Sequence, residues 1–297
     1  MLSFESRTIE ARIILPDGAT ASRPVEIRVD PLSGRTSRIT YSRSAEKEPG
    51  TDALPPPPPS AADAKNCPFC PENIDRCTPR LPSELCPEGR MQRGKAILFP
   101  NLFPYGQYSA VSLMDERHFV EIGTADPRTY ADCFRNCRRY LERVRSADPA
   151  AVYMAITQNH LPSAGGSLVH PHLQVHADRT PPNHLRFLAQ RTADYHTKTG
   201  RGLFSDYLAR EREAGSRLIG QTGNWHWVAA FAPEGFFEIW GILPGVCSLF
   251  DLDADHRESL SEGVLNTQKF YRSLHRNGYN LGLLAVETDT SRLETVS

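Results

Sequence analysis

The chain has 297 residues, and its 34 Lys and Arg against 35 Asp and Glu give a formal net charge of −1 at pH 7. The chain therefore has no excess of positive charge that would bind nucleic acid or an anionic membrane surface. No apolar run approaches the roughly 18 residues of a spanning helix, and the N-terminus lacks the order of a secretory signal. We therefore expect a cytoplasmic protein with one large or two smaller domains, and no nucleic-acid or membrane partner.

The first 50 residues are polar and alternate in places with period two, which predicts strands around a turn at residues 31–34. Five consecutive prolines follow at residues 55–59. Such a run forms an extended polyproline II segment. A passive spacer is the simpler interpretation, and a ligand for a proline-binding partner is the alternative.

The seven cysteines are an odd number, which in a reducing compartment favours thiols or metal ligands over disulfides. Cys67 and Cys70 stand in a Cys-Pro-Phe-Cys motif between proline-rich loops. A Cys-x-x-Cys pair is half of a tetrahedral zinc site, and His118 and His170 are candidates for the other half. A redox function is the alternative use of this motif. Two further cysteines compete as ligands, namely Cys77 and Cys86.

Hydrophobic periodicity predicts the remaining elements in chain order. Paired strands are expected at 96–99 and 108–114, a helix at 126–147, a buried strand at 151–157, mostly helix over 183–217, strands at 225–231 and 236–243, a helix at 253–276 and a strand at 279–284. The order strand–strand–helix–strand thus occurs twice, which indicates a degenerate internal duplication. Cys133 and Cys137 lie one turn apart on the apolar side of the first helix, so we expect core thiols there.

The most informative stretch begins with the small-residue loop 163–167 and continues to residue 176. In an extended strand, residues of one parity share a face. This places three imidazoles and an amide in one row, namely His170, His172, Gln174 and His176. The backbone N–H groups of the preceding loop can approach an anion closely. An anion cradle before a row of imidazoles indicates chemistry on a phosphate.

Two simpler interpretations of this row stay open. The alternation also fits the solvated face of a half-buried sheet. His pairs also ligate zinc without any catalytic function.

Together these residues resemble the galactose-1-phosphate uridylyltransferase branch of the histidine-triad superfamily, including ADP-glucose phosphorylase-like relatives. The motifs that carry the resemblance are Cys67-Pro-Phe-Cys70, Asn101-Leu-Phe-Pro, His118, Asn159 and Gly165-Gly-Ser-Leu-Val-His-Pro-His-Leu-Gln174. Arg28 with residues 31–34 resembles an N-terminal element of the family. Weaker matches in the second half lie at residues 215–217, 225–229, 237–239 and 243–244. The similarity covers roughly residues 25–285.

The resemblance implies an α+β fold of two tandem histidine-triad-like halves, each an antiparallel sheet with packed helices. The first, residues 1–180, would carry catalysis and the zinc site. The second, residues 181–297, would be degenerate and short, either trimmed at the acceptor site or truncated. The resemblance also implies a homodimer.

Residue by residue, the resemblance implies that His172 is the nucleophile that forms a covalent nucleotidyl-imidazole in a ping-pong reaction. Neutral imidazole is a competent nucleophile near pH 7, and its second ring nitrogen needs an acceptor such as a backbone carbonyl. The implied substrate-binding residues are Gln174, Ser167, Gly165, Gly166, Asn159 and Asn101. The implied ligands of a Zn²⁺ cofactor are Cys67, Cys70, His118 and His170.

The expected reaction transfers UMP from UDP-glucose to galactose 1-phosphate, which would place the enzyme in galactose and carbohydrate metabolism. Gln174 stands where histidine-triad hydrolases have a third His, and an amide cannot do acid–base work, which favours transfer over hydrolysis. One alternative is a nucleotide-sugar phosphorylase of the ADP-glucose type that uses inorganic phosphate. Another is a catalytically inert, zinc-stabilised nucleotide-binding protein.

Several positions depart from the family's pattern. Leu102 replaces an Asp that would address ribose, and the polyproline stretch stands roughly where the family has an Arg-Pro-Trp-Gln-Gly loop. Residues 185–190 contain no Glu and no His follows His275, so we expect no second metal site. The residues from Glu287 onward lack the family's segment that helps bind the hexose phosphate.

Overall fold

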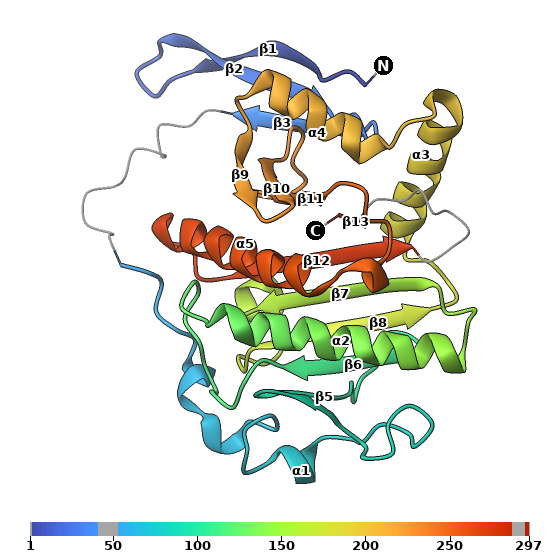
Figure 1. The fold of residues 1–297 in the computed structure, drawn as a ribbon. Coiled ribbons are helices and arrows are strands. Elements are labelled where there is room, and N and C mark those ends of the chain that lie inside the picture. Colours follow the sequence, from blue (N-terminus) through green and yellow to red (C-terminus); the bar gives the residue numbers. More distant parts are fainter. Residues whose placement is uncertain (1, 41–52, 287–294, 297) are drawn as a thin grey trace.

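The computed structural model describes residues 2–40, 53–286 and 295–296. Within these residues the strands form two sheets, one of three strands and one of ten (Figure 1). All the strand pairs are antiparallel. No helix in the described part of the chain has the length and apolarity needed to cross a bilayer.

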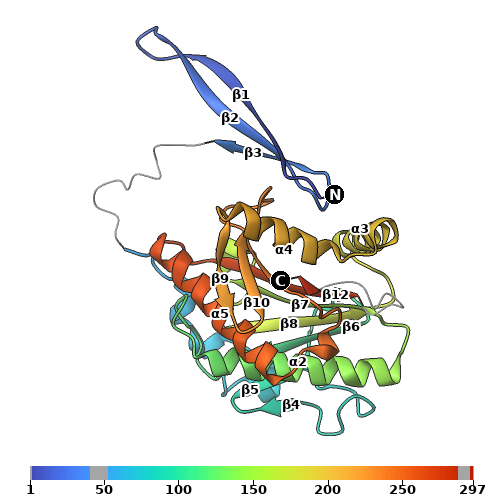
Figure 2. The same cartoon turned by 45° about the horizontal axis from the view of Figure 1, so that its top comes forward.

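The small sheet is an N-terminal unit made of β1 (Glu5–Ile14), β2 (Thr20–Val29) and β3 (Thr36–Thr40), in that order. The carboxylate of Asp30 accepts the backbone N–H groups of Leu32 and Ser33, which closes the expected turn at residues 31–34. The hairpin of β1 and β2 extends away from the rest of the molecule (Figure 2).

The large sheet has the order β4-β5-β6-β8-β7-β12-β13-β11-β10-β9. Its first five strands come from the N-terminal half of the chain: β4 (Met91–Arg93), β5 (Ala96–Pro100), β6 (Tyr108–Leu113), β7 (Tyr153–His160) and β8 (His172–Asp178). The other five follow from the C-terminal half: β9 (Leu218–Thr222), β10 (Trp225–Ala229), β11 (Ile239–Leu243), β12 (Tyr279–Val286) and β13 (Thr295–Val296). The two sets meet where β7 pairs with β12.

Two long helices, α2 (Pro127–Ala147) and α5 (Ala254–Ser273), contact each other and lie across one face of this sheet (Figure 1). Each begins at an aspartate that accepts a backbone N–H of the first turn, Asp126 for α2 and Asp253 for α5. The remaining helices are α1 (Ile74–Cys77), α3 (Asn183–Thr199) and α4 (Leu203–Ala214), with short 3-10 turns at Pro59–Ala62, Ala64–Asn66, Pro162–Ala164 and Leu249–Asp251.

The main hydrophobic core lies between the sheet and these two long helices. It contains Cys137 and Leu173 from the first half and Trp225 and Leu265 from the second, all buried. Cys133 and Cys137 are fully buried in it, which confirms the expected core thiols. The predicted boundary at residues 180–181 therefore crosses a continuous core.

The mixed α/β class with antiparallel sheets is confirmed. The order β5-β6-α2-β7 recurs as β10-β11-α5-β12, but the interpretation as two tandem histidine-triad-like halves stays a prediction, as does the domain boundary.

Several strands differ from expectation. The His-rich strand begins only at His172, so His170 precedes it and does not belong to the row. Pro171 lies between them and has no N–H to donate to the sheet. The strand expected from residue 236 begins at Ile239, and β9 was not expected.

Candidate functional site

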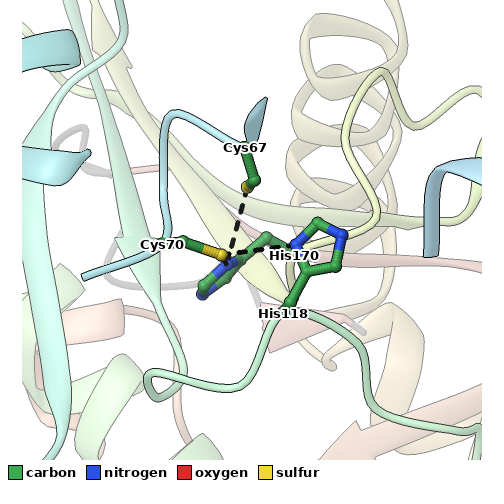
Figure 3. Close-up of side chains that lie close together, drawn as sticks. All are labelled: Cys67, Cys70, His118 and His170. Atoms are coloured by element: carbon green, nitrogen blue, oxygen red, sulfur yellow. Dashed lines mark hydrogen bonds between the residues drawn. The ribbon is translucent and has the colours of Figure 1, made fainter. Parts of the chain in front are cut away.

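Four side chains from three separate segments converge beside the start of β8 (Figure 3). Cys67 and Cys70 come from the loop before α1, His118 from the loop after β6, and His170 from the bend before β8. The ligand atoms of all four lie within 4.8 Å of one another. The structure therefore brings together the Cys-x-x-Cys pair and the two candidate histidines, and the competing Cys77 and Cys86 do not belong to this cluster.

The distances within this cluster fit a tetrahedral metal site. Cys70 Sγ lies 3.4 Å from His118 Nδ1, and the Sγ atoms of Cys67 and Cys70 each lie 3.8 Å from His170 Nδ1. Sulfur and nitrogen atoms bound to one tetrahedral Zn²⁺ are about 3.6 Å apart. Two thiolates and two imidazoles are also the ligand types that zinc prefers. The residues present therefore fit a zinc ion.

Backbone carbonyls orient both imidazoles of the cluster. His170 Nε2 lies 2.9 Å from the carbonyl oxygen of Asp115, and His118 Nε2 lies 2.9 Å from that of Ser60. A carbonyl only accepts, so both Nε2 atoms carry the proton and both Nδ1 lone pairs face the sulfurs. Burial also lowers the pKa of His170 to about 4, which keeps this ring neutral near pH 7.

His172 is the first residue of β8 and is 7% exposed. Its Nδ1 donates to the carbonyl oxygen of His170 at 2.7 Å, which leaves the lone pair on Nε2. Burial lowers the pKa of His172, and this favours the neutral ring. The ring of Phe69, from the Cys-Pro-Phe-Cys loop, lies edge-on at a centroid distance of 5.4 Å. The candidate metal cluster thus borders the candidate nucleophile in two places, at the His170 carbonyl and at the Phe69 ring.

The rest of the row follows from the sheet register. Gln174 lies between Val111 of β6 and Thr157 of β7, and His176 lies between Ser109 and Ala155. His176 Nδ1 lies 3.1 Å from Ser109 Oγ, which supports a structural role for this imidazole. A cavity of about 280 Å³ is lined by Phe69 and by Leu113, the β6 residue opposite His172. A larger one, of about 590 Å³, is lined in part by Trp227 and Trp240, and His172 lines neither cavity.

The glycine loop before β8 has a different role from the one expected. The N–H of Gly165 donates to Pro162 O at 3.0 Å, and that of Gly166 donates to Leu161 O at 2.9 Å. Both amides are therefore used inside the loop, which corrects the expectation that they hold a phosphate. Gly165 has a positive φ of 82°, and a Cβ on Gly166 would come within 2.8 Å of Asn159 O. The two glycines shape the loop, and the hydroxyl of Ser167 on its exposed side stays available.

Asn159 lies at the end of β7, and a residue of the second half orients its side chain. Asn280 Nδ2, from β12, donates to Asn159 Oδ1 at 2.7 Å and to Ala164 O at 2.8 Å. Asn101 is half-buried, and its Oδ1 accepts the N–H of Phe103 at 3.1 Å. Leu102 is 60% exposed, so it forms no part of the core.

Comparison with known proteins places the chain in a family. An uncharacterised protein of Archaeoglobus fulgidus is 30% identical over 286 residues, which are 95% of this chain and 82% of that protein. An ADP-glucose phosphorylase of Arabidopsis thaliana is 23% identical over 86% of this chain and 76% of its own length. A galactose-1-phosphate uridylyltransferase of Neurospora crassa is 29% identical over 43% of this chain and 33% of its own length. The chain belongs to the family of galactose-1-phosphate uridylyltransferases and their ADP-glucose phosphorylase-like relatives. No family model matches it.

Solved structures of this family share the fold of the chain. The crystal structure of an Arabidopsis thaliana ADP-glucose phosphorylase with bound ADP-glucose superposes with a TM-score of 0.69 at 21% identity, over 92% of this chain and 87% of that one. A uridylyltransferase structure gives a TM-score of 0.65 at 17% identity, over 91% and 84%. At this identity the likeness concerns the fold alone.

Four groups that contribute to the candidate site were not identified from the sequence, namely Phe69, Asn280 and the carbonyl groups of Ser60 and Asp115. Phe69 stands inside the recognised motif, so its position was a usable signal. The other three depend on contacts between segments far apart in the chain, and nothing in their local sequence marks them.

Proposed function

We propose that the protein is a nucleotidyltransferase that takes a nucleoside monophosphate from a nucleotide sugar onto His172 and passes it to a phosphate-bearing acceptor. The observation that carries this proposal is the hydrogen bond from His172 Nδ1 to the carbonyl of His170. It fixes the tautomer whose Nε2 lone pair is free to attack phosphorus.

The reaction has two balanced steps. In the first, His172 Nε2 attacks the α-phosphorus, a P–N bond forms, and the bond from that phosphorus to the bridging oxygen breaks to release the sugar 1-phosphate. In the second, a phosphate oxygen of the acceptor attacks the same phosphorus, and the P–N bond breaks to return neutral His172. Neither step needs a proton on the leaving phosphate, so an amide at Gln174 suffices where hydrolases have a third imidazole.

The residues around His172 are proposed to bind the reacting phosphates. The amide group of Gln174 projects from the same face of β8 as His172 and would donate to a non-bridging oxygen. Ser167 and Asn159 border the loop before β8 and would hold further phosphate oxygens. Asn101 would contact the nucleoside, with the exposed Leu102 beside it in place of the family's Asp.

The proposed Zn²⁺ has a structural function in this scheme, held by Cys67, Cys70, His118 and His170. When bound, it would fix the Cys-Pro-Phe-Cys loop against the bend before β8. That contact would hold Phe69 beside His172 and would keep the carbonyl of His170 on His172 Nδ1.

For the substrates, the first candidate is the transfer of UMP from UDP-glucose to galactose 1-phosphate. The second is phosphorolysis of ADP-glucose by inorganic phosphate. One observation favours phosphorolysis. The phosphorylase relative aligns over 76% of its length, and the uridylyltransferase relative over only 33%. Both candidates share the covalent first step.

A turnover assay separates the candidates. Purified enzyme is given UDP-glucose or ADP-glucose together with galactose 1-phosphate or inorganic phosphate, and the products are resolved by chromatography. Turnover of one donor with one acceptor identifies the reaction. Absence of turnover with every combination, in protein with its full metal content, would refute the proposed activity.

A further inference from the structure

The side chain of Asn280, on β12, makes two hydrogen bonds to the first half of the chain. Its Nδ2 donates to Asn159 Oδ1 at 2.7 Å and to the carbonyl oxygen of Ala164 at 2.8 Å. Asn159 lies in β7, and Ala164 lies in the short 3-10 turn of the loop before β8. One residue of the second half therefore connects a strand and a loop of the first half.

The carbonyl of Ala164 determines how both amide side chains are oriented. A backbone carbonyl only accepts, so the group of Asn280 that contacts it must be the NH2 group. The same NH2 group faces Asn159, so the Asn159 atom that receives its hydrogen must be Oδ1. Asn159 Nδ2 is then turned away from β12. None of the described residues accepts a hydrogen bond from this Nδ2, which leaves it available to a ligand.

Asn280, Asn159 and His172 form one row across three strands, on the same face of the large sheet. Asn159 pairs with Asn280 in the ladder of β7 and β12. The ladder of β7 and β8 pairs Thr157 with Gln174, and the same register continued by two residues places Asn159 opposite His172. Side chains directly opposite on neighbouring strands have Cβ atoms about 5 Å apart. The free N–H groups of Asn159 are therefore next to the candidate nucleophile.

The start of β12 is held firmly against the first half. Its ladder with β7 is regular over the whole length of β12. Just before the strand, Gly278 allows a close approach to the loop, because a Cβ there would clash with Ser163 Oγ and would come 3.3 Å from His160 O. A side chain that is supported in this way keeps its geometry better than one on an isolated loop.

We infer that Asn280 is a positioning residue, which holds Asn159 with its N–H groups toward the phosphate that reacts at His172. This inference rests on the proposed function and adds the contribution of the second half to it. A donor that is oriented in advance stabilises negative charge on a phosphate oxygen without having to reorganise. Without Asn280, Asn159 is free to turn its Oδ1 toward the phosphate, where two oxygens repel each other. β12 thus takes part in the reaction although it contains no His.

Single-turnover adduct formation, followed by intact mass at increasing concentrations of ADP-glucose or UDP-glucose, tests this inference. Asn280→Asp keeps the shape of the side chain, but its carboxylate accepts Asn159 Nδ2 and so turns Oδ1 toward the phosphate. We expect the rate at saturating donor to fall roughly a hundredfold in Asn280→Asp and about tenfold in Asn280→Ala, with melting temperatures like that of the wild type. Asn224→Asp, in the exposed turn between β9 and β10, changes the charge equally and should keep the wild-type rate.

A double-mutant cycle separates positioning from a general effect on the fold. If Asn280 acts through Asn159, adding Asn280→Ala to Asn159→Ala should slow adduct formation by less than about twofold more, whereas independent effects multiply. A purely structural role of Asn280 would instead give the same loss in both backgrounds.

Equilibrium binding of the same nucleotide sugars to His172→Ala, which has no nucleophile, tests the inference without the reaction. In this background we expect Asn280→Asp to weaken binding about tenfold. This weaker binding, found together with a wild type that forms no adduct, would refute the proposed function and leave the inference standing. Three results would overturn the inference: an Asn280→Asp variant that matches its parent protein in both adduct rate and binding, losses that multiply in the cycle, or no binding of either nucleotide sugar.

Discussion

His172 and His176 share one face of β8 but differ in what their Nδ1 atoms contact. His172 Nδ1 faces a carbonyl oxygen, which only accepts, so its tautomer is fixed. His176 Nδ1 faces the hydroxyl of Ser109, which can donate or accept, so neither tautomer is imposed. The alternation in the sequence predicts that both imidazoles share a face. It does not reveal which one has a free, oriented nitrogen.

Replacing Gln174 with His should change the fate of the nucleotidyl group. An imidazole at this position can assist proton transfer to and from water, which an amide cannot. We expect Gln174→His to slow transfer by roughly tenfold and to raise the fraction of nucleotide lost to water. Product chromatography with the preferred acceptor measures both rates. An unchanged ratio of hydrolysis to transfer would show that Gln174 does not determine the reaction class, and Gln221→His on the exposed β9 is the matched control.

Buried His160 should make the fold sensitive to acid. Burial lowers the pKa of His160 to about 4, with His172 contributing, whereas the ordinary value is 6.5. The unfolded chain therefore binds a proton more readily than the folded one between these two pH values. The stabilising contribution is complete above about pH 6.5 and is lost as the pH falls toward 4. Urea unfolding measured from pH 6.5 down to pH 4 should show a smaller loss in the free energy of unfolding for His160→Gln than for the wild type. If the free energies of both proteins fall in parallel with pH, this prediction is contradicted.

At the scale of elements, the Cys-Pro-Phe-Cys loop connects metal binding with the nucleophile. Removing both thiols in Cys67→Ser/Cys70→Ser should abolish metal content, because two imidazoles alone do not complete a tetrahedral site. Activity should fall with it, because Phe69 and the His170 carbonyl lose their support.

Elemental analysis, melting temperature and turnover of this variant measure the effect. The control is Cys77→Ser, an exposed thiol outside the cluster, which should keep metal and activity. Full zinc content in the double variant, or none in the folded wild type, would contradict the zinc assignment.

The elements were predictable where periodicity is strong and local. α2 was expected at 126–147 and spans Pro127–Ala147, because Asp126 and Pro127 mark its start and a buried stripe follows. β8 was expected too early, because alternation continues through Pro171 although the proline cannot bond within the sheet. The Cys-x-x-Cys pair was recognisable from residue type and spacing, whereas the choice of His118 and His170 over Cys77 and Cys86 rested on the family resemblance. The hydrogen bonds that the Gly165 and Gly166 amides make within their own loop were not predictable, because they depend on the local path of the loop.

For the whole molecule, one sheet and one main core contain both halves of the chain. Trp225 and Leu265 pack in the same cluster as Cys137 and Leu173, so neither half can bury its apolar surface alone. We expect a single cooperative transition in calorimetry, with equal calorimetric and van't Hoff enthalpies. The fragment 1–180 expressed alone should expose apolar surface and aggregate. Two resolved transitions would instead support independently folding halves divided at that boundary.

The central claim, a covalent nucleotide on His172, is tested most directly by intact-mass spectrometry after brief mixing with UDP-, ADP- and GDP-sugars without acceptor. We predict a mass increase of one nucleoside monophosphate with one of these donors, absent in His172→Ala and retained in His176→Ala, and its size identifies the base. A wild type that gains no mass from any donor, or an adduct that persists in His172→Ala, would contradict the account.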